Sequence, residues 1–216
     1  MPKPHILIFD FDGTIADTHH YIINIANRLC EEFHYKPIHP DEIEALKDKT
    51  SQEIIRLLKV PLLKIPAILA RAKKEFHKGI SNIQPIDGLT EILSQLNEQN
   101  FSMGILSSNS CENITKFLAE NDLDFFNFIH TTSNVWGKNK SLKKLIKELE
   151  FTADDIIYIG DETRDITAAK KLGVKVAAVT WGYNSSKVLE KHHPHFIVHS
   201  PEELFELCMQ LEKEPA

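Results

Sequence analysis

Short apolar runs alternate with stretches of helical periodicity from residue 83 to the end of the chain. The runs are rich in β-branched and aromatic residues, as buried strands are, and the stretches between them are long enough for helices. Alternating strands and helices predict a parallel sheet that helices cover. The predicted strands are Phe101–Leu106, Phe128–Thr131, Ile156–Ile159, Val174–Val179 and Phe196–Val198.

A further apolar run, Ile6–Phe9, lies near the start of the chain and is expected to join the same sheet. The fold class predicted from these runs is therefore α/β, with a doubly wound parallel sheet of the Rossmann type.

The stretch from Asp17 to Ser81 contains no comparable strand pattern and is predicted to be helical. Four prolines divide it into short helices: Pro37, Pro40, Pro61 and Pro66. We expect residues 1–16 and 84–216 to form the α/β domain, and residues 17–83 to form an inserted all-α domain. The two connections would run near Thr14–Thr18 and Gln84–Gly88. Apolar residues at helical spacing include Ile22, Ile25, Ala26 and Leu29, then Ile54, Ile55, Leu57 and Leu58, and finally Ala67, Ile68, Ala72 and Phe76.

Composition argues against two classes of partner. The formal net charge of the 216-residue chain is −6, whereas nucleic acids and anionic membranes are bound by basic surfaces. The sequence shows no apolar run long enough to span a bilayer and no pattern of a secretory leader. We therefore expect a cytoplasmic protein with neither nucleic acid nor membrane as its partner.

Two carboxylates follow the first predicted strand, in the segment Asp10 to Thr14 (DFDGT). Residues at positions i and i+2 of an extended segment point the same way, so Asp10 and Asp12 can face one site. Gly13 permits a sharp turn beside a ligand. A divalent cation would relieve the repulsion between the two acids, and hard oxygen ligands suit Mg²⁺. The alternative is a strand that merely ends in a polar turn.

A second pair of acids follows the strand predicted at Ile156–Ile159. Asp161 stands at the strand end, and Asp165 lies at the start of the next helical pattern, so both could reach the same cation. Asp165 could also cap that helix together with Thr163, and the two roles are compatible.

Two further segments carry polar groups that suit phosphate. The strand ending at Leu106 leads into Ser107, Ser108 and Asn109, just before a helical segment, where hydroxyls and backbone donors can bind an anion. Ordinary turn and capping roles are the alternative. Lys138 follows Gly137 and precedes an amphipathic helix, from which it could reach the sheet edge.

In this order, the four segments resemble the motifs of the haloacid dehalogenase superfamily, in particular its Mg²⁺-dependent phosphatases. The similarity covers Ile6 to about Gly182. It implies that Asp10 is the nucleophile and Asp12 the general acid/base. It also implies that Ser107, with Ser108 and Asn109, binds phosphate, that Lys138 neutralises charge, and that Asp161 and Asp165 join Asp10 and Asp12 at the metal. Lys140 could take the part of Lys138, and Glu162 could join the metal shell through water.

The resemblance further implies the reaction. Dehalogenating members generally lack the second acid of the first motif, so the presence of Asp12 favours hydrolysis of a phosphomonoester through an aspartyl-phosphate on Asp10. The overall pattern is similar to that of the phosphoglycolate phosphatases, which implies a small phosphorylated metabolite as substrate. The helical insertion corresponds to a small cap, and its loop from Lys47 to Gln52, with Lys47 and Lys49, is the predicted substrate contact.

Two alternatives remain open. A phosphosugar mutase of the same superfamily would share Asp10 and Asp12 but return the phosphoryl group to a sugar. A non-catalytic, phosphate-responsive binding module of the receiver type also combines acids, a hydroxyl residue and a lysine. Receiver modules are shorter, however, and have no reason to carry a helical insertion of this length.

Overall fold

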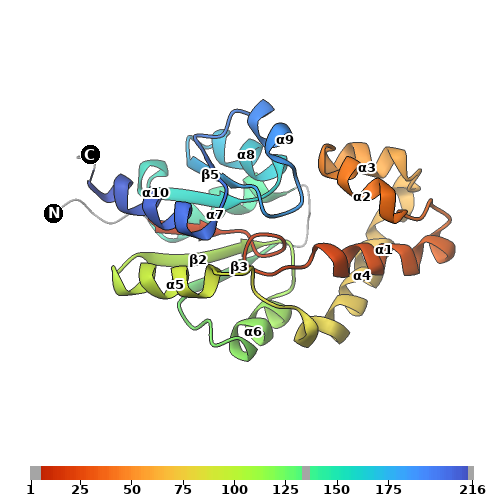
Figure 1. The fold of residues 1–216 in the computed structure, drawn as a ribbon, viewed down its shortest axis with the longest axis horizontal. Helices are drawn as coiled ribbons and strands as arrows, with labels where there is room; N and C mark the ends of the chain where they lie inside the picture. Colours follow the sequence, from red (N-terminus) through yellow and green to blue (C-terminus); the bar gives the residue numbers. More distant parts are fainter. Residues whose placement is uncertain (1–5, 133–136, 214–216) are drawn as a thin grey trace.

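The structure is a computed structural model that describes residues 6–132 and 137–213 of the chain. Its centre is a six-stranded, fully parallel sheet with the strand order β3-β2-β1-β4-β5-β6 (Figure 1). This arrangement confirms the predicted fold class, and each predicted strand is present with ends shifted by one residue at most. The strands are β1 (Ile6–Phe9), β2 (Ser102–Ser107), β3 (Phe128–Thr131), β4 (Ile156–Gly160), β5 (Lys175–Val179) and β6 (Phe196–Val198).

Alternate residues of the strands supply two separate apolar cores, because successive side chains of a strand point to opposite faces. In β1, Leu7 and Phe9 belong to one core, and Ile6 and Ile8 belong to the other. The first core is completed by α5 (Leu89–Glu98), α6 (Cys111–Glu120) and α10 (Pro201–Lys213). The second is completed by α7 (Lys138–Glu148), α8 (Thr163–Lys170) and α9 (Ser186–Lys191).

The strand order determines where a site can form. The chain passes from β1 to β2 and β3 on one side of the sheet, then crosses back to β4 on the other side of β1 and continues to β5 and β6. Sheets of this order carry ligands in the crevice at the carboxyl ends of the strands where the direction reverses. Here that position is the carboxyl end of β1 and β4, which pair with Phe9 opposite Ile159.

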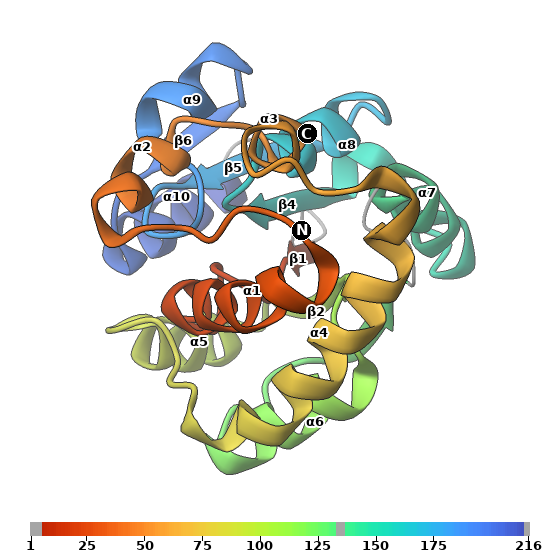
Figure 2. The same ribbon diagram turned by 90° about the vertical axis from the view of Figure 1, so that its right-hand side faces the viewer.

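Residues 19–82, which we call the helical module, form helices without a strand. The module is seen beyond the carboxyl ends of the strands, and it faces the viewer in Figure 2. Its α-helices are α1 (His19–Phe33), α2 (Ile43–Lys47), α3 (Ser51–Leu57) and α4 (Ile65–Gly79), and its short 3₁₀ turns are Pro40–Glu42, Leu62–Lys64 and Ile80–Asn82.

Two connecting segments join the helical module to the sheet, and their backbones are hydrogen-bonded to each other. The amide of Asp17 donates to the carbonyl of Gln84 at 2.9 Å, and the amide of Ile86 donates to the carbonyl of Ile15 at 2.9 Å. These connecting segments lie where the sequence predicts them, near Thr14–Thr18 and Gln84–Gly88. The division into an α/β domain of residues 1–16 and 84–216 and a helical domain of residues 17–83 stays a prediction.

Leu57, which its spacing places on an apolar helix face, is the last residue of α3 and is 51% exposed. Within the described residues, no helix combines the length and apolarity needed to cross a bilayer.

Candidate active site

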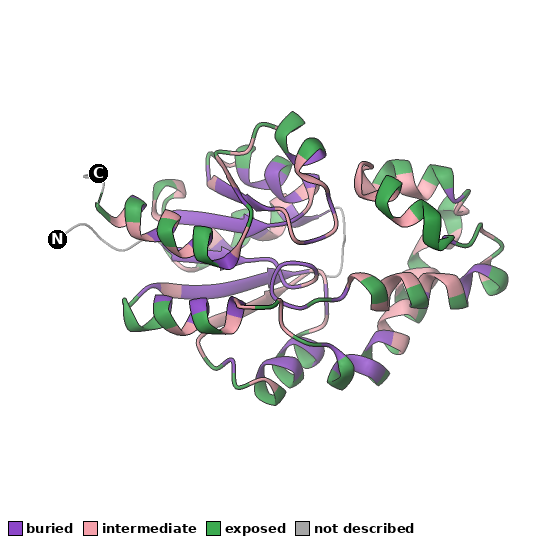
Figure 3. Cartoon of the chain, in the orientation of Figure 1, coloured by how far each residue is buried: buried purple, intermediate pink, exposed green. Residues whose placement is uncertain are grey.

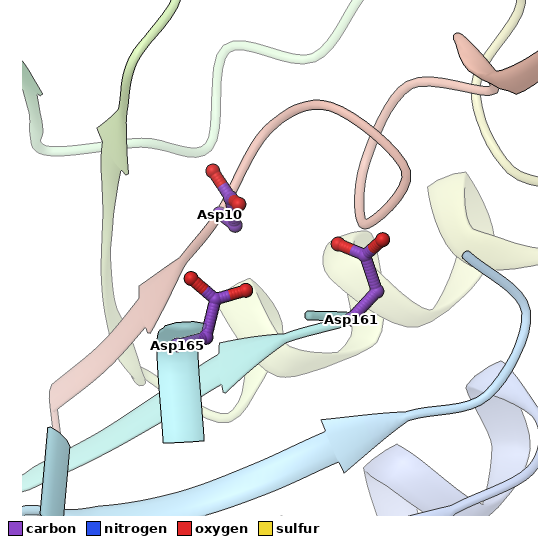
Figure 4. A group of neighbouring side chains, drawn as sticks. All are labelled: Asp10, Asp161 and Asp165. Atoms are coloured by element: carbon purple, nitrogen blue, oxygen red, sulfur yellow. The ribbon is translucent and has the colours of Figure 1, made fainter. Parts of the chain in front are cut away.

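Three buried carboxylates meet at the carboxyl ends of β1 and β4. Asp10 directly follows β1, Asp161 directly follows β4, and Asp165 lies in the first turn of α8 (Figure 4). Their exposed fractions are 2%, 0% and 0%, respectively. One carboxylate oxygen of each lies within 4.8 Å of those of the other two. We call Asp10, Asp161 and Asp165 the acid cluster.

Lys138 supplies positive charge to the acid cluster. Its Nζ lies 2.5 Å from Oδ2 of Asp10 and also pairs with Oδ1 of Asp165. The side chain reaches the cluster because α7 begins at Lys138, after Gly137. Burial lowers the pKa of Lys138, but Asp10 and Asp165 outweigh this effect and raise the pKa well above its usual range. Lys138 is therefore a fixed cation. Lys140, the alternative considered from sequence, is exposed.

Asp161 is held by two loops at the same sheet edge. Thr14 Oγ1 donates to its Oδ1 at 2.7 Å, and the amide of Tyr183 donates to its Oδ2 at 2.7 Å. Gly13 allows the close approach, since it has a φ of 76° and a Cβ there would lie 2.5 Å from Oδ2 of Asp161. The orientation of Asp161 thus depends on the turn after β1 and on the loop after β5.

The acid cluster holds more negative charge than its surroundings stabilise. Burial, with the nearby Glu162 and Asp10, raises the pKa of Asp161 well above its usual range. Burial also raises the pKa of Asp165, to about 6, although Lys138 opposes the shift. Carboxylates that resist ionisation at close range form a favourable site for a divalent cation, which replaces the missing positive charge. The donors are all oxygen atoms, so the set fits a hard ion such as Mg²⁺.

Asp12 stands apart from the acid cluster. The resemblance implies that Asp12 is a metal ligand, but its carboxylate is not part of the group formed by Asp10, Asp161 and Asp165. Instead, Nδ2 of Asn109 donates to both its oxygens, at 3.1 and 3.2 Å. Burial and the charge of Asp10 raise the pKa of Asp12 to about 7, and the Asn109 bond opposes that shift. A carboxyl group with such a pKa can both donate and accept a proton near neutral pH.

The polar segment after β2 lies beside Asp12. Ser107 is fully buried, and its Oγ accepts a hydrogen bond from the amide of Asn109 at 3.0 Å. Ser108 and Asn109 line the same cavity as Asp12. The helix that follows, α6, is capped by Ser110, whose hydroxyl accepts from the amide of Asn113 at 3.2 Å. The structure therefore brings the predicted phosphate-binding residues to the edge that holds Asp10 and Asp12.

The loop predicted to contact substrate rests against the core. Oγ of Ser51 donates to Oε2 of Glu162 at 2.9 Å. Nδ2 of Asn184 donates to the carbonyls of Lys47 and Lys49, at 3.3 and 2.9 Å. Lys47 and Lys49 also line the cavity that reaches Asp12. The helical module is thus hydrogen-bonded to the segments that follow β4 and β5.

Sequence reasoning missed two groups of residues that shape the site. The first is the loop after β5, where Tyr183 holds Asp161 and Asn184 holds the helical module. Its position after a strand at the same sheet edge could have indicated it. The second is Asn113 with His77, which support Asn109 from α6 and α4. No local pattern marks those two residues.

Comparisons with known proteins agree with this geometry. The family model of haloacid dehalogenase-like hydrolases matches residues 7–179. A phosphoglycolate phosphatase from Synechococcus elongatus is 31% identical over 95% of this chain and 97% of its own length. The pyrophosphatase PpaX from Halalkalibacterium halodurans is 25% identical over 93% of this chain and 95% of its own length.

Solved structures show the same fold. The crystal structure of a predicted phosphatase from Clostridium acetobutylicum superimposes with a TM-score of 0.82, with 21% identity, over 96% of this chain and all of that one. The predicted enzyme class, a phosphatase-type hydrolase, is confirmed by the curated relatives. From its matched residues and its relatives, the chain belongs to the haloacid dehalogenase-like hydrolase family.

Proposed function

We propose that the protein is a Mg²⁺-dependent phosphatase that hydrolyses a small phosphomonoester through a covalent intermediate on Asp10. The observation that carries the proposal is the difference in surroundings between Asp10 and Asp12. Asp10 lies in a buried cluster with Lys138, whereas Asp12 is held separately by Asn109 and has a pKa of about 7. One acid is thereby suited to attack phosphorus and the other to move protons.

In the first step, a carboxylate oxygen of Asp10 attacks phosphorus, and the bond to the departing alkoxide breaks. Asp12, protonated, gives its proton to that alkoxide, and an alcohol leaves. In the second step, Asp12, now ionised, removes a proton from water, and the resulting hydroxide attacks the phosphorus of the aspartyl-phosphate. Asp10 and inorganic phosphate are released, and Asp12 is again protonated.

Charge neutralisation makes the attack feasible, since both reactants are anions. Lys138 contributes a permanent positive charge 2.5 Å from Asp10. Asp10, Asp161 and Asp165 would hold Mg²⁺, which, when bound, withdraws charge from the phosphoryl oxygens. Ser107, Ser108 and Asn109 would bind the phosphoryl group from the end of β2.

Phosphoglycolate is the first substrate to test, because the Synechococcus relative is named for that activity. Phosphate release is measured with phosphoglycolate and a panel of other phosphomonoesters, in Mg²⁺ and in a chelator. Asp10→Asn should lower turnover by about 10³-fold or more, since it removes the nucleophile. Asp17→Asn is the matched control, because Asp17 is exposed and outside the acid cluster.

Metal-dependent release that Asp10→Asn abolishes and Asp17→Asn preserves would support the proposal. Release that is equally fast in chelator, or that persists in Asp10→Asn, would contradict it. Transfer of phosphate to a sugar without release to water would favour the mutase alternative.

A further inference from the structure

A cavity of about 410 Å³ connects the proposed catalytic residues with the interior of the helical module. Its core end is lined by Asp12, Ser108, Asn109 and Glu162. From there it extends between the helices of the module. Any molecule whose phosphoryl group lies at Asp12 and Ser108 therefore has this cavity next to its organic part.

The cavity changes character with distance from the core. His19 and Lys47 belong to its core end. The ring of His19 packs edge-on against that of Tyr183, with 5.2 Å between ring centroids, and the carbonyl of Lys47 accepts a hydrogen bond from Asn184. Lys73 on α4 adds another cation to the lining. Most of the remaining wall is aliphatic, as represented by Ile25, Leu29, Ile54, Leu58, Ile68 and Ala72.

The aliphatic side chains that α3 and α4 contribute are only partly buried, whereas Ile25 and Leu29 on α1 belong to the first apolar core. Ile54 and Ile55 on α3, and Ile68 and Leu69 on α4, are only partly buried, and no residue of α2 or α3 is classed as buried. Figure 3 shows the contrast, with buried strands in the sheet and mostly intermediate or exposed residues in the helical module. Apolar helix faces normally close into a dense core. Here they enclose space instead.

We propose that this cavity binds the organic part of the substrate, and that the substrate is a phosphate monoester of an apolar alcohol. The inference rests on the proposed phosphatase function and adds its substrate class. Apolar groups gain free energy by leaving water for an apolar wall, and the volume is within the range of sites for organic ligands. A glycolate group is short, so it would stay at the core end near His19 and Lys47 and leave the aliphatic part of the cavity unfilled.

The first test is a homologous series of n-alkyl phosphates from ethyl to octyl, with phosphoglycolate alongside, assayed by phosphate release in Mg²⁺. We expect kcat/KM to rise by about two- to fourfold for each added methylene until the cavity is full. A flat or falling series, with phosphoglycolate the best substrate, would overturn the inference and leave the phosphatase proposal standing.

A binding measurement separates failure of the inference from failure of the phosphatase proposal. The affinity of Asp10→Asn for the same alkyl phosphates, measured by calorimetry with Mg²⁺, should rise along the series. If wild-type protein hydrolyses no ester yet affinity rises with chain length, the phosphatase proposal fails and the binding site stands. If affinity does not change with chain length, the apolar site is wrong whatever the turnover.

A matched pair of variants on α4 locates the effect. Ala72 lines the cavity, whereas Ala70 on the same helix is exposed. Ala72→Phe should flatten the dependence on chain length by filling the cavity, and Ala70→Phe should leave it as in wild type. Ala26→Phe, which fills the cavity from α1, replaces Ala72→Phe if that variant does not fold. Equal behaviour of the filled and control variants would overturn the assignment.

Discussion

The side-chain amide of Asn109 holds the carboxylate of Asp12, with Nδ2 3.1 Å from one oxygen and 3.2 Å from the other. Asn109 is held in turn by Asn113, whose Nδ2 donates to Oδ1 of Asn109 at 2.9 Å. Nδ1 of His77 lies 2.7 Å from Oδ1 of Asn113 and must be the donor, since an amide oxygen only accepts. Hydrogen bonds thus connect the proposed acid/base with α4 of the helical module.

Asn109→Ala should lower kcat by about 10-fold to 100-fold, because a hydrogen bond to a charged group contributes about 1.5–3 kcal/mol. It should also raise the apparent pKa that Asp12 contributes to the pH–rate profile, since the hydrogen bond from Asn109 lowers the pKa of Asp12. Steady-state phosphate release across pH tests both. Asn97→Ala, on the exposed side of α5, is the control. A fall in kcat without a change in that apparent pKa would argue against the view that Asn109 acts through Asp12.

Lys138→Met should abolish turnover and destabilise the metal-free protein by about 3–5 kcal/mol, because it leaves buried carboxylates without their partner. Lys140→Met makes the same change on an exposed side chain and should alter stability by no more than about 0.5 kcal/mol. Denaturant unfolding in chelator and phosphate release measure the two effects. Similar losses in both variants would contradict the assignment of Lys138.

The metal-free protein should lose stability as pH rises from about 4 to about 7. The pKa of Asp165 is raised to about 6 and that of Asp12 to about 7, so the folded state keeps protons that the unfolded chain has released. The free energy of unfolding therefore falls with pH across this window. Thermal unfolding in chelator at a series of pH values checks the sign, and a stability that rises across the window would refute it.

Mg²⁺ should stabilise the protein more at pH 8 than at pH 5.5, because protons and metal compete for the same carboxylates. At an Mg²⁺ concentration 100 times Kd, the gain at pH 8 should be about 2.7 kcal/mol, which is roughly 5–10 °C in Tm. Asp161→Asn should reduce this gain, and Asp17→Asn should preserve it. An equal effect of Mg²⁺ at both pH values would speak against metal binding by the acid cluster.

Asn184→Ala should loosen the helical module from the core. Asn184 is 5% exposed, and its amide group bonds to the carbonyls of Lys47 and Lys49 and to the amide of Thr163. We expect a loss of about 1–3 kcal/mol and faster amide hydrogen exchange in residues 47–51. Lys187→Ala removes an exposed ion pair to Asp48 in the same contact and should change little. Unchanged exchange in Asn184→Ala would show that the contact does not hold the module.

Local patterns in the sequence were sufficient to predict the strands of the sheet and to identify most of the acidic residues at the candidate active site. Strand runs such as Ile6–Phe9 and Ile156–Ile159 are recognisable because burial on both faces requires continuous apolar residues. The acids that follow β1 and β4 could be placed on one edge because parallel strands present their carboxyl ends together. Periodicity and turn residues are properties of neighbouring positions, so the sequence reports them directly.

The tertiary structure alone decided which groups touch. It selected Lys138 over Lys140, separated Asp12 from the acid cluster, and brought Thr14 and Tyr183 to Asp161. It also showed that the apolar faces of the helical module surround a cavity, although their spacing alone would equally suit a closed core. These contacts join residues far apart in the chain, such as Thr14 and Asp161, which are 147 positions apart. Their geometry depends on the path of the whole backbone and on how side chains pack, which no local pattern encodes.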